Sequence, residues 1–183
     1  MKGKIVVYVS SAVLGIVCAV VLSGYFMVVS VCGNGMEPAL SSGDRVVVAK
    51  NAYHDRAPKV GELVAVVCDV YGENGEGNLL IRRVVGEPGD LVEIRQGVFY
   101  RNGEPYENNM WEAVNMEDME KVQLRKDQFF VLCDNRKSVM DSRNEALGIL
   151  QPDDCRGKVC LGQRRIGKDL IHETRSQQQK STT

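Results

Sequence analysis

Hydrophobic and polar positions divide the chain into one long apolar stretch followed by a series of short apolar runs. From Ile5 to about Val31 the stretch contains no charged residue, and Lys2 and Lys4 precede it. About 20 apolar residues are enough to cross a bilayer as a helix, and this stretch is longer than that. The apolar region of a cleaved signal peptide is shorter and ends at small residues. The pattern therefore predicts a retained transmembrane helix.

The charges beside this stretch predict its orientation. Lys2 and Lys4 lie before it, and no comparable basic cluster follows it immediately. Basic flanking residues stay on the cytoplasmic side of a membrane. We therefore expect a single-pass protein of the cell membrane, with a cytoplasmic N-terminus and with the residues from about Gly33 onward outside the cell.

Beyond the stretch, runs of β-branched residues alternate with Gly, Pro, Asn and Asp. Such runs between turn signals are typical of strands, and their number predicts a largely antiparallel β domain. Gln96-Gly97 and Asn102-Gly103 are typical hairpin turns. Tyr106 to Glu120 is polar and rich in Met, and we expect a loop or a short helix there. The predicted strands cover residues 45–49, 62–68, 79–85, 91–94, 98–100 and 129–132.

These patterns give three parts and a mainly β fold class. Residues 1–32 are the cytoplasmic N-terminus and the transmembrane anchor, and residues 33–167 are the extracytoplasmic β domain. Residues 168–183 contain Gln, Ser, Thr and Lys without apolar periodicity, so we expect a disordered tail.

The balance of charge argues against nucleic acid as a partner. The chain carries 23 Lys and Arg against 24 Asp and Glu, a formal net charge of −1, so no strong basic field surrounds it. His54 and His172 are far apart among polar residues, and no Cys/His array has the spacing of metal ligands. We therefore expect no metal site and no cofactor.

The chain contains six cysteines, and their pairing stays open. Cys18 lies within the apolar stretch, facing lipid or a helix. The other five are expected on the oxidising side of the membrane, where an odd number cannot all pair within one chain. Cys155 and Cys160 are near enough in sequence to form a disulfide, but buried free thiols fit the spacing equally well. The five open positions are Cys32, Cys68, Cys133, Cys155 and Cys160.

Three motifs carry the candidate chemistry. Residues 33–40 read Gly-Asn-Gly-Met-Glu-Pro-Ala-Leu, residues 80–90 read Leu-Ile-Arg-Arg-Val-Val-Gly-Glu-Pro-Gly-Asp, and residues 133–143 read Cys-Asp-Asn-Arg-Lys-Ser-Val-Met-Asp-Ser-Arg. In order and spacing, behind a membrane span, they resemble the boxes of bacterial type I signal peptidase, the membrane-bound Ser/Lys protease of the S26 family that removes export signals. The resemblance runs from about residue 5 to about residue 162 and implies a signal peptidase-like antiparallel β domain.

The resemblance also implies that both reactive residues have been replaced. The family pattern Gly-x-Ser-Met-x-Pro puts Gly35 at the position of the serine nucleophile. The family pattern Lys-Arg puts Arg82 at the position of the general-base lysine. Glycine has no side-chain nucleophile, and arginine stays protonated and cannot accept the serine proton. We expect Arg82 to turn to a carboxylate or to solvent, since a pocket that suits a neutral lysine does not suit its charge.

The third box departs from the family pattern Gly-Asp-Asn-x-x-x-Ser-x-Asp-Ser-Arg at two positions. Cys133 replaces the glycine, and the family serine that orients the lysine falls on Val139. Ser138 is one residue early, so we expect it to face the other way. An Asp141–Arg143 pair is expected to brace the box. The residues expected to line the peptide-binding or structural site are Met36, Pro38, Arg83, Cys133, Asp134, Val139, Asp141, Ser142 and Arg143.

These departures favour a non-catalytic binding protein. Signal peptidase-like proteins without the dyad are known as accessory factors in pilus assembly, which implies an exported preprotein or a pilin segment as the partner. We expect an extended segment to bind by strand addition between Met36-Glu37-Pro38 and the strand 83–86, with extra room beside Gly35. The alternative is an active signal peptidase I, a serine endopeptidase that removes signal peptides from exported preproteins.

Overall fold

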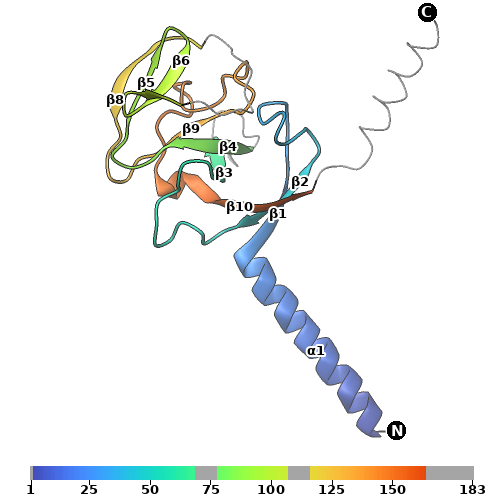
Figure 1. Cartoon of the computed structure of the whole chain (residues 1–183). Helices are drawn as coiled ribbons and strands as arrows, with labels where there is room; N and C mark the ends of the chain where they lie inside the picture. The colour runs from blue at the N-terminus through green and yellow to red at the C-terminus, as the bar shows by residue number, and fades with distance from the viewer. Residues whose placement is uncertain (1, 69–77, 107–115, 164–183) are drawn as a thin grey trace, which may run out of the picture.

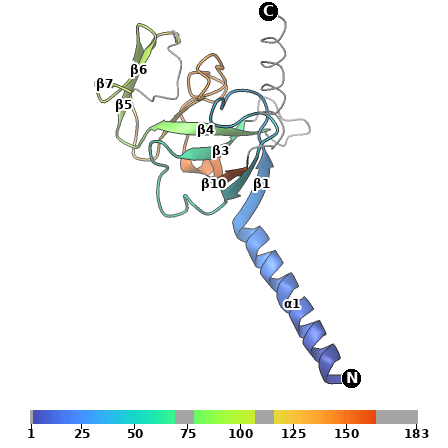
Figure 2. The same cartoon turned by 45° about the vertical axis from the view of Figure 1, so that its right-hand side comes forward.

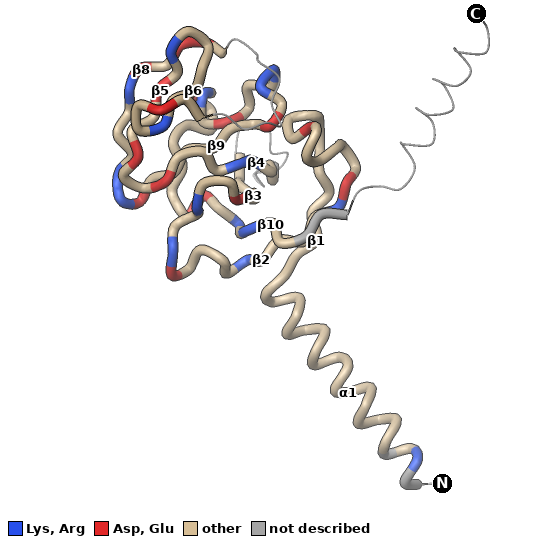
Figure 3. The backbone as a smooth tube through the Cα atoms, in the orientation of Figure 1, with Lys and Arg blue, Asp and Glu red and all other residues tan. Residues whose placement is uncertain are grey.

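One long helix, α1 (Lys2–Tyr25), leads into a domain made almost entirely of strands (Figure 1). The computed structural model describes residues 2–68, 78–106 and 116–163. Within α1, Val7–Tyr25 is long and apolar enough to cross a membrane, with a mean hydropathy of 2.2, and none of it is buried against the domain. In Figure 3 the charged residues coloured along α1 lie only at its N-terminal end. The mainly β fold class, with one N-terminal helix that is a candidate membrane span, is confirmed.

The helix ends earlier than the apolar stretch does. After Tyr25 the chain continues as strand β1 (Phe26–Ser30), which pairs antiparallel with β2 (Arg45–Ala49) from Phe26↔Ala49 to Ser30↔Arg45. Alternate side chains of β1 face the core, where Met27 and Val29 pack. The expectation of one helix to about Val31 is therefore wrong at this end, because Phe26–Ser30 pair with β2.

The larger sheet has six strands, all antiparallel to their neighbours, and carries the candidate site. Their order across the sheet is β1-β2-β10-β3-β4-β9. A 3₁₀ turn at Pro152–Asp154 precedes β10. The four further strands are β3 (Leu63–Cys68), β4 (Asn78–Gly86), β9 (Phe130–Leu132) and β10 (Cys155–Gln163).

A smaller four-stranded sheet lies at the end of the domain away from α1 (Figures 1 and 2). Positive φ angles at Gln96 (52°), Gly97 (75°), Asn102 (55°) and Gly103 (84°) form the two hairpin turns that the sequence predicts. The strand order is β7-β6-β5-β8. The strands are β5 (Leu91–Arg95), β6 (Val98–Arg101), β7 (Glu104–Pro105) and β8 (Met119–Gln123).

The six predicted strands are confirmed as β2 to β6 and β9, and four strands were missed, β1, β7, β8 and β10. Strand β8 begins within the segment 106–120, which was expected to be a loop or a short helix, and β10 was not predicted at all. Residues 107–115 and the expected disordered tail, 168–183, lie outside the described residues.

The apolar core nearest the candidate site extends across the larger sheet from β2 to β4. It brings the segment after β1 against β2, β3 and β4, so that the first and second sequence motifs pack on one cluster. Its buried members are Val31, Met36, Leu40, Val46, Val48, Ala65 and Ile81.

Candidate functional site

The first motif forms a turn that is fastened to the third motif. Met36 is buried in the core, and its carbonyl accepts from the Leu40 N–H at 2.8 Å. The Asn135 main-chain N–H donates to the Gly35 carbonyl at 3.0 Å, and the Asn135 amide donates to the Asn34 carbonyl at 3.2 Å. Pro38 lies on the exposed side of the turn. Residue 35 is thus held between the two motifs.

The space beside Gly35 is filled. A Cβ atom placed on Gly35 would lie 3.3 Å from Ser138 Oγ, 3.4 Å from Cys133 Sγ and 3.6 Å from Arg82 Nη1. At these distances an added methyl group would already be in contact with three side chains. The expectation of extra room beside Gly35 is therefore wrong, because the second and third motifs supply larger side chains there.

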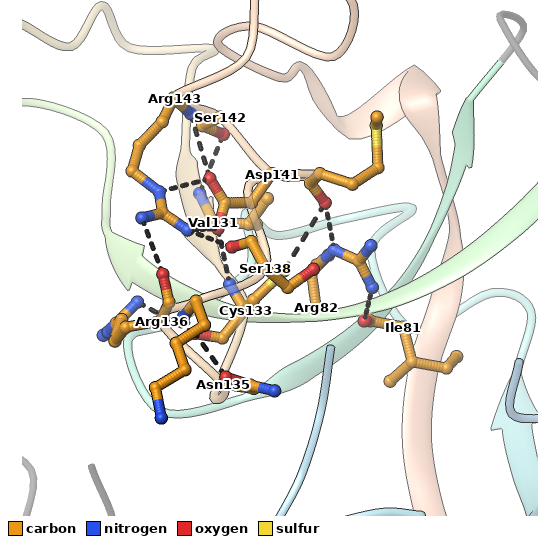
Figure 4. A network of polar contacts seen from close by, with 12 residues as sticks. Ile81, Arg82, Val131, Cys133, Asn135, Arg136, Ser138, Asp141, Ser142 and Arg143 are labelled. Atoms are coloured by element: carbon orange, nitrogen blue, oxygen red, sulfur yellow. Dashed lines mark hydrogen bonds and ion pairs between the residues drawn. The ribbon is translucent and has the colours of Figure 1, made fainter. Parts of the chain in front are cut away.

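Arg82 extends from β4 into this space with only 6% of its surface exposed. Its Nε donates to the Met140 carbonyl, and its Nη1 donates to the Ile81 carbonyl (Figure 4). Among the described residues, no carboxylate lies within 4 Å of its guanidinium group. Of the two expected surroundings of Arg82, a carboxylate or solvent, the carboxylate is not found, since two main-chain carbonyls accept its hydrogen bonds, and solvent reaches only 6% of its surface.

Cys133 is buried beside Arg82. Its main-chain N–H donates to Asp141 Oδ2 at 2.8 Å, and its thiol lies 3.6 Å from the Met140 carbonyl. Burial raises the pKa of the thiol to about 11, although the charge of Arg82 acts in the opposite direction. The thiol is therefore protonated at neutral pH, and its nucleophilicity is low.

The side chains of Ser138 and Val139 lie opposite to expectation. Ser138 Oγ faces Gly35, whereas the Val139 side chain is 59% exposed. The rule that a one-residue offset reverses a side chain holds along a strand. Residues 133–142 instead form turns, one of which is closed by the Ser138 N–H donating to the Asn135 carbonyl at 3.0 Å. Val139 is consequently not part of this site.

Two Arg–Asp pairs hold the third motif in place beside the site. Arg83 binds Asp134 through two hydrogen bonds of 2.7 and 2.6 Å, and their side chains are 10% and 0% exposed. Arg143 binds Asp141 through two hydrogen bonds of 2.8 and 2.7 Å. The Ser142 hydroxyl accepts from Val131 N at 3.0 Å. The expected Asp141–Arg143 pair is therefore present and ties the motif together.

One buried arginine of the site, Arg136, was not among the predicted site residues. Arg136 is buried, and its Nη1 donates to the Cys133 carbonyl at 3.0 Å. Burial lowers its pKa to about 10, against the opposing charge of Asp141. Arg136 stands at a variable position of the motif, so the pattern gave no signal for it.

The two halves of β4 have different neighbours. All of Asn78–Arg83 pairs with β3, but β9 pairs only with the second half, from Arg83↔Leu132 to Gly86↔Phe130. Arg83 therefore has a partner strand on each side, and Val84 bonds Glu62 and Gly61 on one side and pairs with Val131 on the other. The expectation that a segment is added beside the strand 83–86 is wrong at these two residues. The first half, 78–81, has no strand on its second side in the described part of the chain.

Comparison with known families places the chain. The family model described as "Signal peptidase, peptidase S26" matches residues 4–161. The chain belongs to this family. It is 29% identical over 167 residues to signal peptidase I P of Bacillus subtilis subsp. natto, covering 85% of this chain and 87% of that protein. It is 34% identical over 113 residues to probable signal peptidase I-1 of Synechocystis sp., covering 60% of this chain.

Some relatives and one solved structure match a smaller part of this chain or of the relative. The chain spans 57% and 50% of the length of the two Synechocystis relatives that it matches. A crystal structure of a signal peptidase I from Enterococcus faecalis V583 has a TM-score of 0.46 and 21% sequence identity, and the match covers 57% of this chain and 98% of that chain. Membrane association agrees with the family and with the apolar helix.

Proposed function

We propose that this S26 family member is a non-catalytic membrane protein. In this proposal it binds an extended segment of an exported preprotein or a pilin and assists assembly of surface proteins or pili. Its main domain lies outside the cell and its N-terminus in the cytoplasm. The observation that carries the proposal is the packing of Arg82 against Gly35, which leaves neither a nucleophile nor a base at the family's two reactive positions.

Acyl transfer needs a nucleophile within reach of a group that accepts its proton. Ser138 and Cys133 both lie beside Gly35. The Cys133 thiol has a pKa of about 11, raised by burial, and neither residue has a neutral base at the position of Arg82. These features support a scaffold that lacks the chemistry of the family.

The open half of β4 supports the binding role. Strand addition to such an edge holds an extended chain through main-chain hydrogen bonds. Leu79 and Ile81 lie on this edge, and Ile81 belongs to the core cluster beneath Gly35. An added segment would therefore lie along β4 beside the replaced dyad.

A cleavage assay tests the loss of chemistry. Full-length protein in lipid vesicles is incubated with a preprotein between about pH 6 and 10, the range in which a lysine base would work. We expect no cleavage above background, while a B. subtilis signal peptidase I in matched vesicles cleaves. Cleavage that disappears in Ser138→Ala or Cys133→Ala would establish the active-enzyme alternative, and cleavage that persists in both would identify a contaminating host peptidase.

Photo-crosslinking tests the binding role. A photoreactive residue at Leu79, on the open half of β4, should capture a co-expressed pilin or exported preprotein in intact cells. The matched control is Val98, which is exposed on the smaller sheet. Equal capture at both positions would reject β4 as the binding edge.

A further inference from the structure

At the position of the family's lysine, Arg82 carries a permanent positive charge that has no anionic partner among the described residues. Four arginines surround the site, Arg82, Arg83, Arg136 and Arg143, and the two aspartates of the third motif are each held by one of them. Arg83 takes Asp134 and Arg143 takes Asp141, each through two hydrogen bonds. Arg82 is left with two neutral carbonyl acceptors. A buried charge is best stabilised by an opposite charge, and an arginine cannot lose its proton to avoid the cost.

One nitrogen of Arg82 remains available. Its Nε and Nη1 have acceptors, whereas its Nη2 has none among the described residues. Arg82 as a whole keeps 6% of its surface exposed. A guanidinium group in this position can donate to a carboxylate oxygen that arrives from outside.

Arg82 also interrupts the open edge of β4. The Val84 N–H and C=O bond Glu62 and Gly61, toward β3. Main-chain groups alternate sides along a strand, and pairing with β3 is regular from Asn78 to Arg83, so the groups of Ile81 point to the open side. The Ile81 carbonyl already accepts from Arg82 Nη1. Hydrogen bonding to an added strand must then end beside the guanidinium group.

We propose that the Arg82 guanidinium, at the end of the open β4 edge, recognises a carboxylate on the bound segment. The carboxylate is either an acidic side chain or the free carboxyl group at a peptide's C-terminus. The inference rests on the proposed peptide-binding function and specifies its ligand. A peptide fits better than a lipid headgroup, because the charge adjoins a strand edge that offers main-chain hydrogen bonds.

The test uses the full-length protein in nanodiscs of zwitterionic lipid and three fluorescent peptides of one apolar sequence. The first has a free C-terminal carboxylate, the second a C-terminal amide, and the third an amide with one internal Asp. Fluorescence anisotropy gives each Kd. We expect the amide to bind about tenfold more weakly than the better of the two carboxylates, the effect of one charged hydrogen-bonded pair. Which carboxylate binds better distinguishes the two sources.

Variants assign that preference to its residue. Arg82→Met should remove it, and Arg82→Lys should keep part of it, because a lysine retains the charge without the planar fork. Arg125→Met is the control, since it removes the same charge from an exposed position. Should Arg82→Met fail to fold, Arg82→Lys decides the assignment, because a preference that is unchanged in this variant would place carboxylate recognition at another residue.

Four outcomes would overturn the inference. Equal Kd values for all three peptides reject carboxylate recognition but leave peptide binding intact. A carboxylate preference that survives in folded Arg82→Met places it at another site. Dependence on Arg82 that appears only with anionic lipid assigns the charge to a headgroup. No binding of any peptide rejects the proposed function together with the inference.

Discussion

At the scale of single residues, the departures from the family pattern are physically coupled. Arg82 and Cys133 both place atoms within 4 Å of where a side chain at position 35 would begin. A serine introduced at Gly35 would meet the Cys133 thiol and the Arg82 guanidinium before it met a substrate. Reversing one change alone is therefore insufficient to rebuild the site.

This coupling predicts the result of restoring the dyad. Gly35→Ser with Arg82→Lys should show no cleavage of a preprotein, because Cys133 still crowds position 35. Adding Cys133→Gly opens that space while Ser138 already faces it, and the triple variant should cleave on the order of 100-fold above background, the usual contribution of a general base. The double variant with Val139→Ser is the control and should stay inactive. Cleavage by the double variant would show that Cys133 does not block the site.

The buried Arg83–Asp134 pair gives a prediction for stability. Removing one partner by Asp134→Ala leaves a buried guanidinium uncompensated and should cost about 3–5 kcal/mol. Replacing both residues, Arg83→Met with Asp134→Leu, should cost less than Asp134→Ala alone. Urea unfolding measures both, and Asp55→Ala, at a position 93% exposed, should change little. A double variant less stable than the single one would contradict this account.

At the scale of elements, one carboxylate joins the loop before β3 to β10. Glu62 accepts from Tyr53 at 3.0 Å, from Arg56 at 3.0 and 3.1 Å, and from Lys158 on β10 at 2.7 Å. Burial by itself would raise the pKa of Glu62, but the hydrogen bonds from Arg56 and Lys158 outweigh it and lower the pKa to about 2. Burial and Glu62 together raise the pKa of Tyr53, which keeps it a donor.

The lowered pKa of Glu62 predicts how stability depends on pH. Because the folded-state pKa lies below the unfolded value, the stabilisation is complete above about pH 4.5 and is lost as the pH falls toward about 2. Glu62→Gln should lose about 1–3 kcal/mol at neutral pH and show a flatter slope in this window. Thermal unfolding between these pH values measures it, with the exposed Glu104→Gln as control. Parallel pH profiles for Glu62→Gln and the unaltered protein would contradict the assignment.

The sequence predicted elements with a local signal and missed those fixed by distant partners. Strands β2 to β6 and β9 have β-branched runs between turn residues. Strand β10 has none, and it lies between β2 and β3, which precede it by many residues. At Gly157 a Cβ would fall 2.1 Å from the Ala49 carbonyl oxygen, so the glycine that weakens the strand pattern is what allows this close approach. Strand β1 has the same apolar composition as the helix before it.

The candidate site could be predicted in part for a similar reason. Motif spacing correctly identified Gly35 and Arg82 as neighbours, since family geometry fixes those positions. The acceptors of Arg82 and the direction of Ser138 depend on turns within 133–142, and residue counting carries no information on turn conformation. Arg136 became part of the site through the same turns.

At the scale of the whole molecule, α1 and the β domain define two environments for the cysteines. All six lie in the described residues and none forms a disulfide. Cys18 is in α1, Cys32 and Cys160 are exposed on the domain, and Cys68 and Cys133 are buried. Burial raises the pKa of Cys155 to about 11. The two exposed thiols therefore report the side of the membrane on which the domain lies.

This arrangement predicts the labelling of intact cells. A membrane-impermeant maleimide should label Cys32 and Cys160 without lysis, because the domain is proposed to be extracellular. Cys18 should stay unlabelled, and the variant Cys32→Ser with Cys160→Ser should lose most of the signal. Labelling only after lysis would reverse the proposed orientation, and a mass shift on Cys18 in intact cells would contradict a membrane-embedded α1.

The junction of α1 and β1 limits how far the domain can lie from the membrane, and so where it can meet a binding partner. The helix passes into the strand without a linker, and Lys50, the residue after β2, holds the junction. Its main-chain N–H donates to the Tyr25 carbonyl at 2.9 Å, and its ammonium group donates to the Ser23 carbonyl at 2.8 Å. The five residues of β1 extend about 17 Å at about 3.3 Å each. In the proposed orientation β1 thus connects the domain to the membrane helix over a fixed length. The far end of β1 lies at most about 17 Å from the end of the apolar helix. A partner is therefore selected by how near its segment lies to the bilayer as well as by its composition.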